Sequence, residues 1–487
     1  MPTKPWEETA KATLDASLSP LPHEKNELDW KSALSENTEK LAHHISAFAN
    51  SPGGGFLVFG VGDDGSLVGV KEGNYLEMAK RLGNIARQSV VPAIRIDYSI
   101  LSYKDVELLF VYIPESIEKP VHYCRGTIYD SYIRSAGQTR KMTRTEVARA
   151  IATSAGVSFE QEAASEEISA EQVIKYIDIQ SFFDLLNKPF PTDTNAIIEE
   201  LISENFIKRV NSLFIITNLG ALLCAKKLYR LFPLSGLDRK AVRVINYEKA
   251  DRLRTLKERE FTKGYAAGFE TIIQYINDQI PSNEIIGQAL RQEVKLYPEL
   301  AIRELVANAL IHQDFQEIGT GPMVEIFPDR VEITNPGRPL VNTMRFIDTP
   351  PQSRNEMIAA FMRRINICEE RGSGIDKVIA AVELAQLPPP EFIETENHTK
   401  VVLYAPRPFG KMEKEEKVRA CYQHCCLKYV SGSKMSNQSI RERFNIGEKN
   451  YPVASKIIRD TLDANLIKLA SPGSKSRKHA TYIPFWA

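Results

Sequence analysis

Carboxylates and a lysine stand close together near the start of this chain, in the segment HEKNELDWK. Asp29 and Lys31 point to the same side if the segment is extended, and Glu24 precedes them by a few residues. Asp63 follows the apolar run FLVFGV, where the chain can fold back beside the first segment. Oxygen ligands suit Mg²⁺ or Mn²⁺, and a lysine can hold a phosphate or activate water. The spacing fits a catalytic metal site, and it also fits solvated carboxylates beside a helix N-terminus.

A second group of polar residues lies in the helical pattern PELAIRELVANALIHQDF. Glu304 and Asn308 are four residues apart and share one helix face, and His312 is one turn further along. Glu304 can polarise a water molecule, and the carbonyl oxygen of Asn308 can bind Mg²⁺. The alternative is a helix whose polar face is turned toward water.

The elements that must position the first group are a helix, a glycine turn and several strands. The pattern predicts a helix over 38–50 with Thr38 as its N-cap, then a turn at 51–55, a strand at 56–61, and a hairpin turn at 63–65 leading to a returning strand. Further strands are expected at 94–101, 107–113 and 129–134, and a closing helix at 143–155. These elements define a first domain, residues 1–155.

The rest of the chain divides into four parts. Residues 156–171 are small, polar and acidic, which is typical of a linker. Residues 172–240 fit a small connector resembling a winged helix, and residues 241–408 alternate helix and strand, with amphipathic helices expected at 268–280 and 284–295. Residues 409–487 show three helices and two short strands, the order of a winged helix. The expected fold class is therefore α/β (α+β) and multidomain.

The first domain resembles the Schlafen AlbA_2 family over about residues 20–155. The resemblance rests on AFANSPGGGFLVFGVGDDGSLVGV, on the upstream DWK and on the later PVHYCRGTIYDSYIRSAGQTR. It implies a metal-dependent nuclease site at Glu24, Asp29 and Asp63, with Lys31 beside it. Asp29 stands where the family usually has Glu, one methylene longer.

The segment 298–400 resembles GHKL ATPases, and most closely their divergent HATPase_c_4-type subfamily. The resemblance rests on RELVANALIHQDF, FPDRVEITNPG and ERGSGIDKV. It implies an α/β sandwich in which Glu304 is the general base and Asn308 the Mg²⁺ ligand. It also implies ATP-binding roles at His312, Asn335, Gly337, Gly372, Ser373 and Gly374. Asn335 replaces the usual adenine-binding Asp, and Pro339 replaces a glycine of the same turn.

Nucleic-acid binding must rest on local basic surface, because the net charge of the chain is zero. The tail 410–487 has 15 basic and 7 acidic side chains, a net charge of +8. The residues expected to contact DNA or RNA, tRNA included, are Arg134, Arg140, Lys141, Lys456, Arg459, Lys475, Arg477 and Lys478. The alternatives are a solvated charged face in the first domain and a protein-binding winged helix in the tail.

Several function classes are excluded by what the sequence lacks. It has no apolar run long enough for a membrane span and begins without an apolar signal core, so we expect a cytoplasmic protein with no membrane partner. Six cysteines fit a reducing compartment, and Cys421, Cys425 and Cys426 are expected to be buried packing residues. There is no G-x-x-x-x-G-K-[ST] motif, which argues against a P-loop motor.

Three interpretations of function remain from the sequence. The first is an ATP-responsive, metal-dependent Schlafen-like nuclease acting on RNA or DNA, with a role in phage defence suggested by the resemblance. The second is an ATP-binding transcriptional regulator that binds DNA without cutting it. The third is a scaffold with an inactive ATP site. A homo-oligomer is expected because GHKL domains often dimerise.

Overall fold

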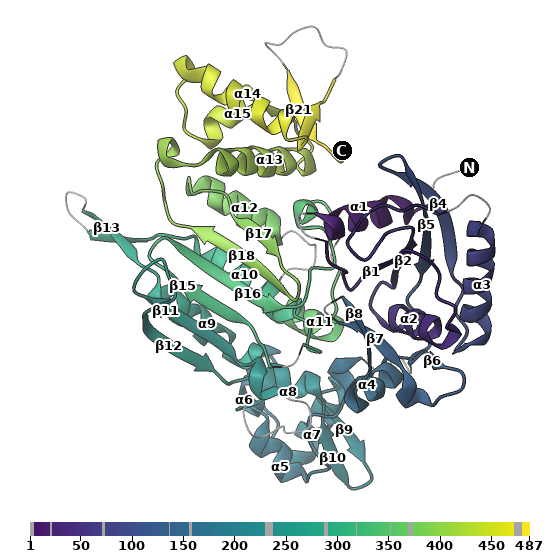
Figure 1. Ribbon diagram of the computed structural model, residues 1–487. Helices are drawn as coiled ribbons and strands as arrows, with labels where there is room; N and C mark the ends of the chain where they lie inside the picture. Colours follow the sequence, from purple (N-terminus) through teal and green to yellow (C-terminus); the bar gives the residue numbers. More distant parts are fainter. Residues whose placement is uncertain are drawn as a thin grey trace. The chain divides into compact units, whose positions relative to one another are not determined.

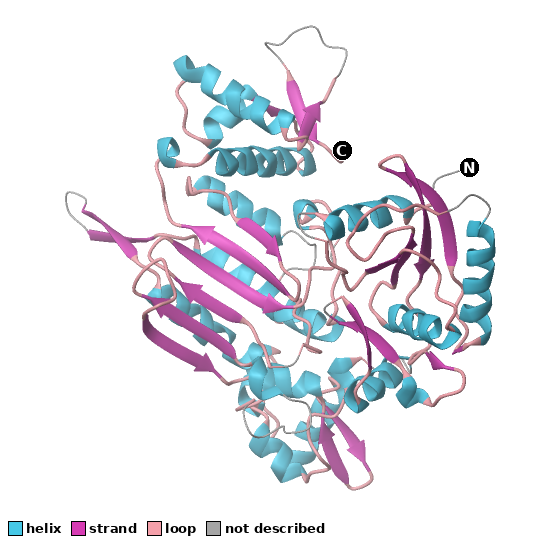
Figure 2. Ribbon diagram, in the orientation of Figure 1, coloured by secondary structure: helices cyan, strands magenta, loops and turns pink. Residues whose placement is uncertain are grey.

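The computed structural model describes residues 4–19, 22–70, 74–135, 137–154, 158–228, 237–286, 291–317, 319–350, 352–368, 374–471 and 480–487. Their contacts divide into two compact units, residues 1–158 and 159–487 (Figure 1). Both units mix helices with sheets, which confirms the predicted α/β class (Figure 2). Of the described helices, none has the length and apolar character needed to cross a bilayer.

The first unit is built on a four-stranded sheet with the order β1-β2-β5-β4. β1 runs parallel to β2, and the other neighbours are antiparallel. β2 is apolar throughout because both faces of the sheet are covered: Leu57 and Phe59 pack in the cluster of α2 and α3, and Phe56 and Val58 pack in that of α1. The bounds are β1 Leu28–Lys31, β2 Gly55–Phe59, β4 Asp97–Tyr103, β5 Val106–Ile113, α1 Glu7–Leu18, α2 Thr38–Asn50 and α3 Asn74–Gln88.

The predicted helix over 38–50 is confirmed, but its N-cap is Asn37 rather than Thr38. The Asn37 side chain accepts a hydrogen bond from the Lys40 backbone N–H at 3.0 Å. The glycine turn that follows requires glycine at Gly54, which has a φ of 73°, and a Cβ there would lie 2.2 Å from the Ile113 carbonyl oxygen. This close approach lets β2 pair with β5.

Smaller elements complete the first unit. β7 and β8 form a hairpin whose strand β7 carries Arg134 toward the sheet. The expected return strand after the turn at 63–65 is reduced to a single bridge between Val61 and Leu67. The bounds are β3 Val90–Val91, β6 His122–Tyr123, β7 Tyr132–Ser135, β8 Gln138–Lys141 and α4 Arg144–Ser154.

The second unit begins where a linker was predicted, and that prediction is wrong for residues 158–171. Ala163 pairs with Thr217 and Ile168 pairs with Phe214, so this segment adds to the hairpin of β9 and β10. Its small and polar residues pack closely against their neighbours and are not those of an exposed linker, since Ala164 and Ser165 are buried. The bounds are α5 Ala170–Tyr176, α6 Ile179–Leu185, α7 Thr194–Ser203, β9 Ile207–Val210, β10 Leu213–Ile216 and α8 Asn218–Cys224.

A six-stranded sheet with the order β12-β11-β15-β16-β18-β17 forms the centre of the second unit (Figure 1). α9, α10 and α12 pack on one face of it in a single hydrophobic core. The predicted helix over 284–295 is wrong: β13 and β14 pair there, because a short apolar pattern fits either period. The bounds are β11 Val242–Tyr247, β12 Thr255–Phe261, α9 Tyr265–Gln279, β13 Ser282–Ile286, β14 Arg291–Lys295, α10 Glu299–Ile311, β15 Met323–Ile326, β16 Arg330–Pro336, α11 Glu356–Arg364, α12 Gly374–Leu384, β17 Glu391–Glu394 and β18 His398–Tyr404.

The described residues of the tail form three α-helices and a small sheet with the order β19-β21-β20. Its core includes Cys421, Cys425 and Cys426, which are buried as predicted, and also Ile379 of α12. The tail therefore packs directly on α12. The bounds are α13 Lys414–Val430, β19 Met435–Ser436, α14 Asn437–Arg443, α15 Tyr451–Asp463, β20 Ile467–Leu469 and β21 Thr481–Pro484.

Candidate functional site

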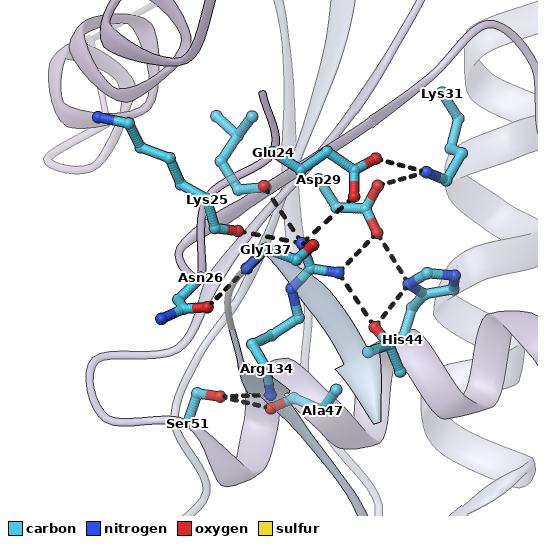
Figure 3. A network of polar contacts seen from close by, with 12 residues as sticks. Glu24, Lys25, Asn26, Asp29, Lys31, His44, Ala47, Ser51, Arg134 and Gly137 are labelled. Carbon is cyan, nitrogen blue, oxygen red and sulfur yellow. Dashed lines mark hydrogen bonds and ion pairs between the residues drawn. The ribbon is translucent and has the colours of Figure 1, made fainter. Parts of the chain in front are cut away.

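Asp29 lies at the centre of a charged network in the first unit (Figure 3). Its side chain is fully buried on β1, where β1 lies beside β2. Oδ2 lies 2.9 Å from Arg134 Nη1 and 2.9 Å from His44 Nδ1, and Oδ1 lies 2.5 Å from Lys31 Nζ. Three different elements, β1, α2 and β7, therefore meet at this one carboxylate.

The Arg134 guanidinium is held from several sides. The exposed fraction of its side chain is 1%, and it lies over the Phe48 ring at 5.0 Å. Nη2 donates hydrogen bonds to the carbonyl oxygens of Lys25, at 3.0 Å, and Gly137, at 2.5 Å. The predicted role of Arg134 in phosphate binding is corrected here, because its guanidinium is buried and already paired.

The charges of this network stabilise one another. Burial alone would raise the pKa of Asp29, but the hydrogen bond from His44 and the charge of Lys31 hold it below its usual range. Burial alone would lower the pKa of Lys31, but Asp29 and Glu24 raise it above its usual value. Burial and the neighbouring Asp29 raise the pKa of Glu24. Asp29 and Lys31 are thus ionised at neutral pH in a closed set of ion pairs.

The predicted metal ligands Glu24, Asp29 and Asp63 do not form a metal site in the part of the chain that the structure describes, where no three His, Cys, Asp or Glu side chains are placed to hold an ion. Glu24 lies 2.8 Å from Lys31 Nζ, and Asp63 is exposed in the turn after β2. The carboxylate oxygens of Asp29 face cations instead of an open coordination position. These residues do not fit the expected Mg²⁺ or Mn²⁺.

The second group of predicted residues lines one cavity of about 460 Å³ in the second unit. This volume is in the range of small-molecule sites, which are mostly apolar with a few polar groups. The apolar lining includes Leu305, Ile333, Phe346, Phe392 and Val401. The predicted residues that line it are Glu304, Asn308, His312, Asn335 and Gly374.

One end of this cavity lies where α12 begins against α10. A Cβ placed at Gly374 would lie 2.9 Å from Glu304 Oε2 and 3.7 Å from Asn308 Nδ2, so only a small residue leaves space there. Glu304 is buried and Asn308 is half-buried, and both supply hard oxygen atoms. A Mg²⁺ ion that accompanies a nucleotide would fit this donor set.

Asn335 and Thr399 form a second polar group, on the neighbouring strands β16 and β18. They are directly paired in the strand register, and both line the cavity. Asn335 Nδ2 donates to the Pro336 carbonyl at 3.1 Å, and its Oδ1 has no hydrogen bond to the described residues. Asn335 therefore offers an acceptor to a ligand.

Gly337 lies next to the Asn335 end of the cavity, but it is not one of the described residues that line the cavity. Its φ is 94°, and a Cβ would lie 2.6 Å from the Asp314 Cβ, so glycine is needed for the chain to pass the end of α10. Burial and the nearby Arg354 lower the pKa of His312 to about 4, so His312 is neutral at physiological pH. The predicted residues Gly372 and Ser373 lie outside the described residues.

Sequence reasoning missed several cavity residues. Thr399 comes from a strand that pairs with β16, and no sequence motif marked it. Arg363 lies on α11, Arg354 lies in the segment before this helix, and Cys368 lies in the segment after it. The two adjacent arginines at 363–364 were the one sign in the sequence of a basic group near the cavity, but the sequence does not say which of them faces it.

The predicted nucleic-acid residues fall into two kinds. Arg140 lies 2.6 Å from Glu146, and Lys141 lies 2.7 Å from Asp130, so both are exposed but paired. Lys456 and Arg459 on α15 are exposed and have no ion pair with the described residues. The predicted contacts Lys475, Arg477 and Lys478 lie outside the described residues.

Two family models match parts of this chain. The model named "Schlafen, AlbA_2" matches residues 24–143, and the model named "Putative ATP-dependent DNA helicase recG C-terminal" matches residues 319–403. The predicted combination of these two domains in one chain is confirmed. No curated protein matches the chain.

Two solved structures are similar to this chain. The crystal structure of the DIP2311 protein from Corynebacterium diphtheriae is 17% identical, with a TM-score of 0.43, and the match covers 98% of this chain and 96% of that one. The solution structure of the N-terminal domain of a RecG-related protein from Nitrosomonas europaea is 22% identical, with a TM-score of 0.21. That match covers 28% of this chain and 93% of the other.

Proposed function

We propose that this chain, which carries a Schlafen AlbA_2 domain and an ATPase-type domain of the recG C-terminal family, binds nucleic acid under the control of ATP. The observation that carries the proposal is the cavity lined by Glu304, Asn308 and Asn335. The name of the second family, which refers to a DNA helicase, supports the nucleic-acid part. Because the sequence lacks a P-loop motif, we propose a nucleotide-dependent switch and not a motor.

We propose one orientation for ATP in this cavity. The free acceptor of Asn335 would receive a hydrogen bond from the adenine amino group, and the apolar walls would cover the base. Asn308 and Glu304 would hold the Mg²⁺ of the nucleotide, which neutralises phosphate charge. Glu304 of α10, buried beside the start of α12, is the candidate general base for hydrolysis.

The tail is the candidate DNA-binding domain, as a winged helix. The three α-helices of its described residues and the sheet order β19-β21-β20 suit that fold, and α15 would be the helix that enters the major groove. Lys456 and Arg459 on α15 are exposed and unpaired among the described residues, so they can contact phosphates without first losing an ion pair.

α12 offers a direct route from the nucleotide to the tail. It begins at Gly374 beside Glu304, and near its other end Glu383 lies 3.0 Å from His424 of α13. The segment around Met344 offers a second route, because the Tyr422 hydroxyl donates to the Met344 carbonyl at 2.5 Å. A shift of α12 on nucleotide binding would therefore move the tail.

For the AlbA_2 domain we propose nucleic-acid binding without cleavage. The closed pairing of Asp29 with Arg134, His44 and Lys31 supports this choice over a metal-dependent nuclease. Because Asp29 connects three elements of the unit, the family's acidic position here has a structural role.

Fluorescence anisotropy of labelled duplex DNA and single-stranded RNA with the full chain tests the proposal, with and without Mg-ATP. We expect ATP to change the affinity for one of them at least about five-fold, a typical size for coupling between sites. The double variant Lys456→Ala/Arg459→Ala should weaken binding and lower the salt slope by about 2. Arg140→Ala/Lys141→Ala removes the same charge from paired residues and serves as the matched control, with a smaller expected loss. Affinities that do not respond to ATP would refute the proposal.

A further inference from the structure

Arg363 is a cation of the nucleotide cavity that has no partner of opposite charge in the part of the chain that the structure describes. It lies near the end of α11, it is half-buried, and it makes no ion pair with the described residues. Two nearby arginines differ in this respect. Arg354 lies 3.7 Å from Asp314, and Arg364, which follows Arg363 directly, lies 2.5 Å from Glu204. A partly desolvated guanidinium without a counter-charge is a favourable site for an anionic ligand.

Arg363 belongs to the Glu304 end of the cavity. Both side chains act on the thiol of Cys368: burial raises its pKa to about 11, which the positive charge of Arg363 opposes and the negative charge of Glu304 favours. Cys368 and Gly374 both line the cavity, and Arg303, the residue before Glu304, donates a hydrogen bond at 3.5 Å to the carbonyl oxygen of Asn366, three residues after Arg363. Arg363, Glu304 and the start of α12 therefore surround one part of the cavity.

The base end lies at a distance along α10. Glu304 and His312 are eight residues apart, which is about 12 Å along a helix axis. Asp314, two residues beyond His312, lies against Gly337 in the turn that follows Asn335. A ligand whose base lies beside Asn335 thus extends its far end toward Glu304 and Arg363.

We propose that Arg363 binds the terminal phosphate of the nucleotide and makes the site distinguish a nucleoside triphosphate from a diphosphate. This inference rests on the proposed nucleotide binding. The planar fork of an arginine matches two phosphate oxygens, which a lysine cannot do. Without Arg363, the terminal phosphate would face the Glu304 carboxylate with less positive charge to compensate it.

Isothermal titration of the full chain with Mg-ATP and with Mg-ADP tests this proposal. For Arg363→Gln we expect the ATP affinity to fall at least about ten-fold and the ADP affinity by less than about three-fold. Arg363→Lys keeps the charge and should recover part of the ATP affinity. Arg364→Gln is the matched control, because its guanidinium is paired with Glu204, and it should leave both affinities unchanged.

Two different failures are distinguishable in this experiment. If wild-type protein binds neither nucleotide, the proposed function is wrong. If wild-type protein binds ATP but Arg363→Gln loses the same affinity for ATP and ADP, or loses none, the role of Arg363 is wrong and the nucleotide site stands. Thermal unfolding of each variant shows whether a loss of binding comes from a loss of fold.

Discussion

The two polar sites of this chain differ in what their charged groups face. Around Asp29, the carboxylate, the guanidinium of Arg134 and the ammonium of Lys31 face one another, and the set is closed. Around Glu304, the polar groups face a cavity of about 460 Å³, and one cation, Arg363, has no counter-charge among the described residues. Both sites contain residue types that could do chemistry, but only the second leaves space for a ligand.

The difference shows that residue types suited to binding a metal ion can instead pair with one another in an ion-pair network. An ion-pair network that satisfies every charge stabilises the arrangement of its elements, and breaking it leaves a buried charge alone. A site that binds a ligand must instead leave some groups unsatisfied until the ligand arrives. The predictions below separate these two cases.

The largest effect is expected from Asp29→Ala. Removal of one partner from a buried charge network typically costs about 3 to 5 kcal/mol of the free energy of unfolding, because the buried Arg134 guanidinium loses the carboxylate that its Nη1 contacts, while Lys31 keeps its ion pair with Glu24. Urea unfolding followed by tryptophan fluorescence measures it, since Trp30 is buried next to Asp29. Asp63→Ala, at an exposed carboxylate, is the control and should change the stability by less than about 0.5 kcal/mol. Equal stabilities of the two variants would remove the distinction between the sites.

A large effect on ligand binding is expected from Gly374→Leu. The new side chain would occupy the space beside Glu304 and Asn308, so we expect a loss of ATP affinity of about 2 kcal/mol or more, which is about thirty-fold. Isothermal titration measures it. Gly410→Leu is the control, because a Cβ at Gly410 meets nothing within 4 Å. Unchanged ATP binding in Gly374→Leu would show that the nucleotide lies elsewhere.

A smaller effect is expected from Tyr422→Phe, which removes the hydrogen bond to the Met344 carbonyl and the one received from Trp486. We expect the ATP-dependent change in DNA affinity to shrink by about 1 kcal/mol, the usual value of a hydrogen bond, while ATP affinity stays the same. Anisotropy titrations with and without ATP measure the difference. Tyr429→Phe on the same helix is the control. An equal effect there would argue against a route from the cavity to the tail through the Tyr422–Met344 hydrogen bond.

An effect that is small near neutral pH and grows toward acid pH is expected from the titration of His312. Its pKa is 6.5 when unfolded and about 4 when folded, so the unfolded chain binds more protons between these values. The stability of the second unit should therefore fall as the pH decreases from 6.5 toward 4, and be unaffected by this group above 6.5. His312→Asn should make this part of the pH dependence disappear in thermal unfolding experiments. A difference between variant and wild type that is constant with pH would contradict the lowered pKa.

The local parts of the fold were predictable from the sequence. The helix over 38–50 has the bounds that its periodicity indicates, and the helix expected at 143–155 is observed at Arg144–Ser154. The motifs around Glu304, Asn335 and Gly374 identified residues that the structure brings to one cavity, where Glu304 lies within α10, Asn335 near the end of β16 and Gly374 at the start of α12.

The long-range parts were not predictable. Asp29 and Arg134 are 105 residues apart, and nothing in either segment indicates that a guanidinium occupies the expected metal position. The pairing of Asn335 with Thr399 depends on the strand order, which a single sequence does not specify. The expected linker at 156–171 has the composition of an exposed segment, yet its small residues pack against β10.

The most direct test of the central contrast follows one labelled RNA and one labelled DNA in the same reaction with the full chain, Mn²⁺ or Mg²⁺, and ATP. Binding by anisotropy and integrity by gel electrophoresis are measured together. We predict that both substrates stay intact with either metal and that ATP changes the affinity of the chain for at least one of them. Metal-dependent cleavage that disappears in Glu24→Gln/Asp63→Ala would contradict the account, since it would show that the acidic residues of the first unit form a working metal site.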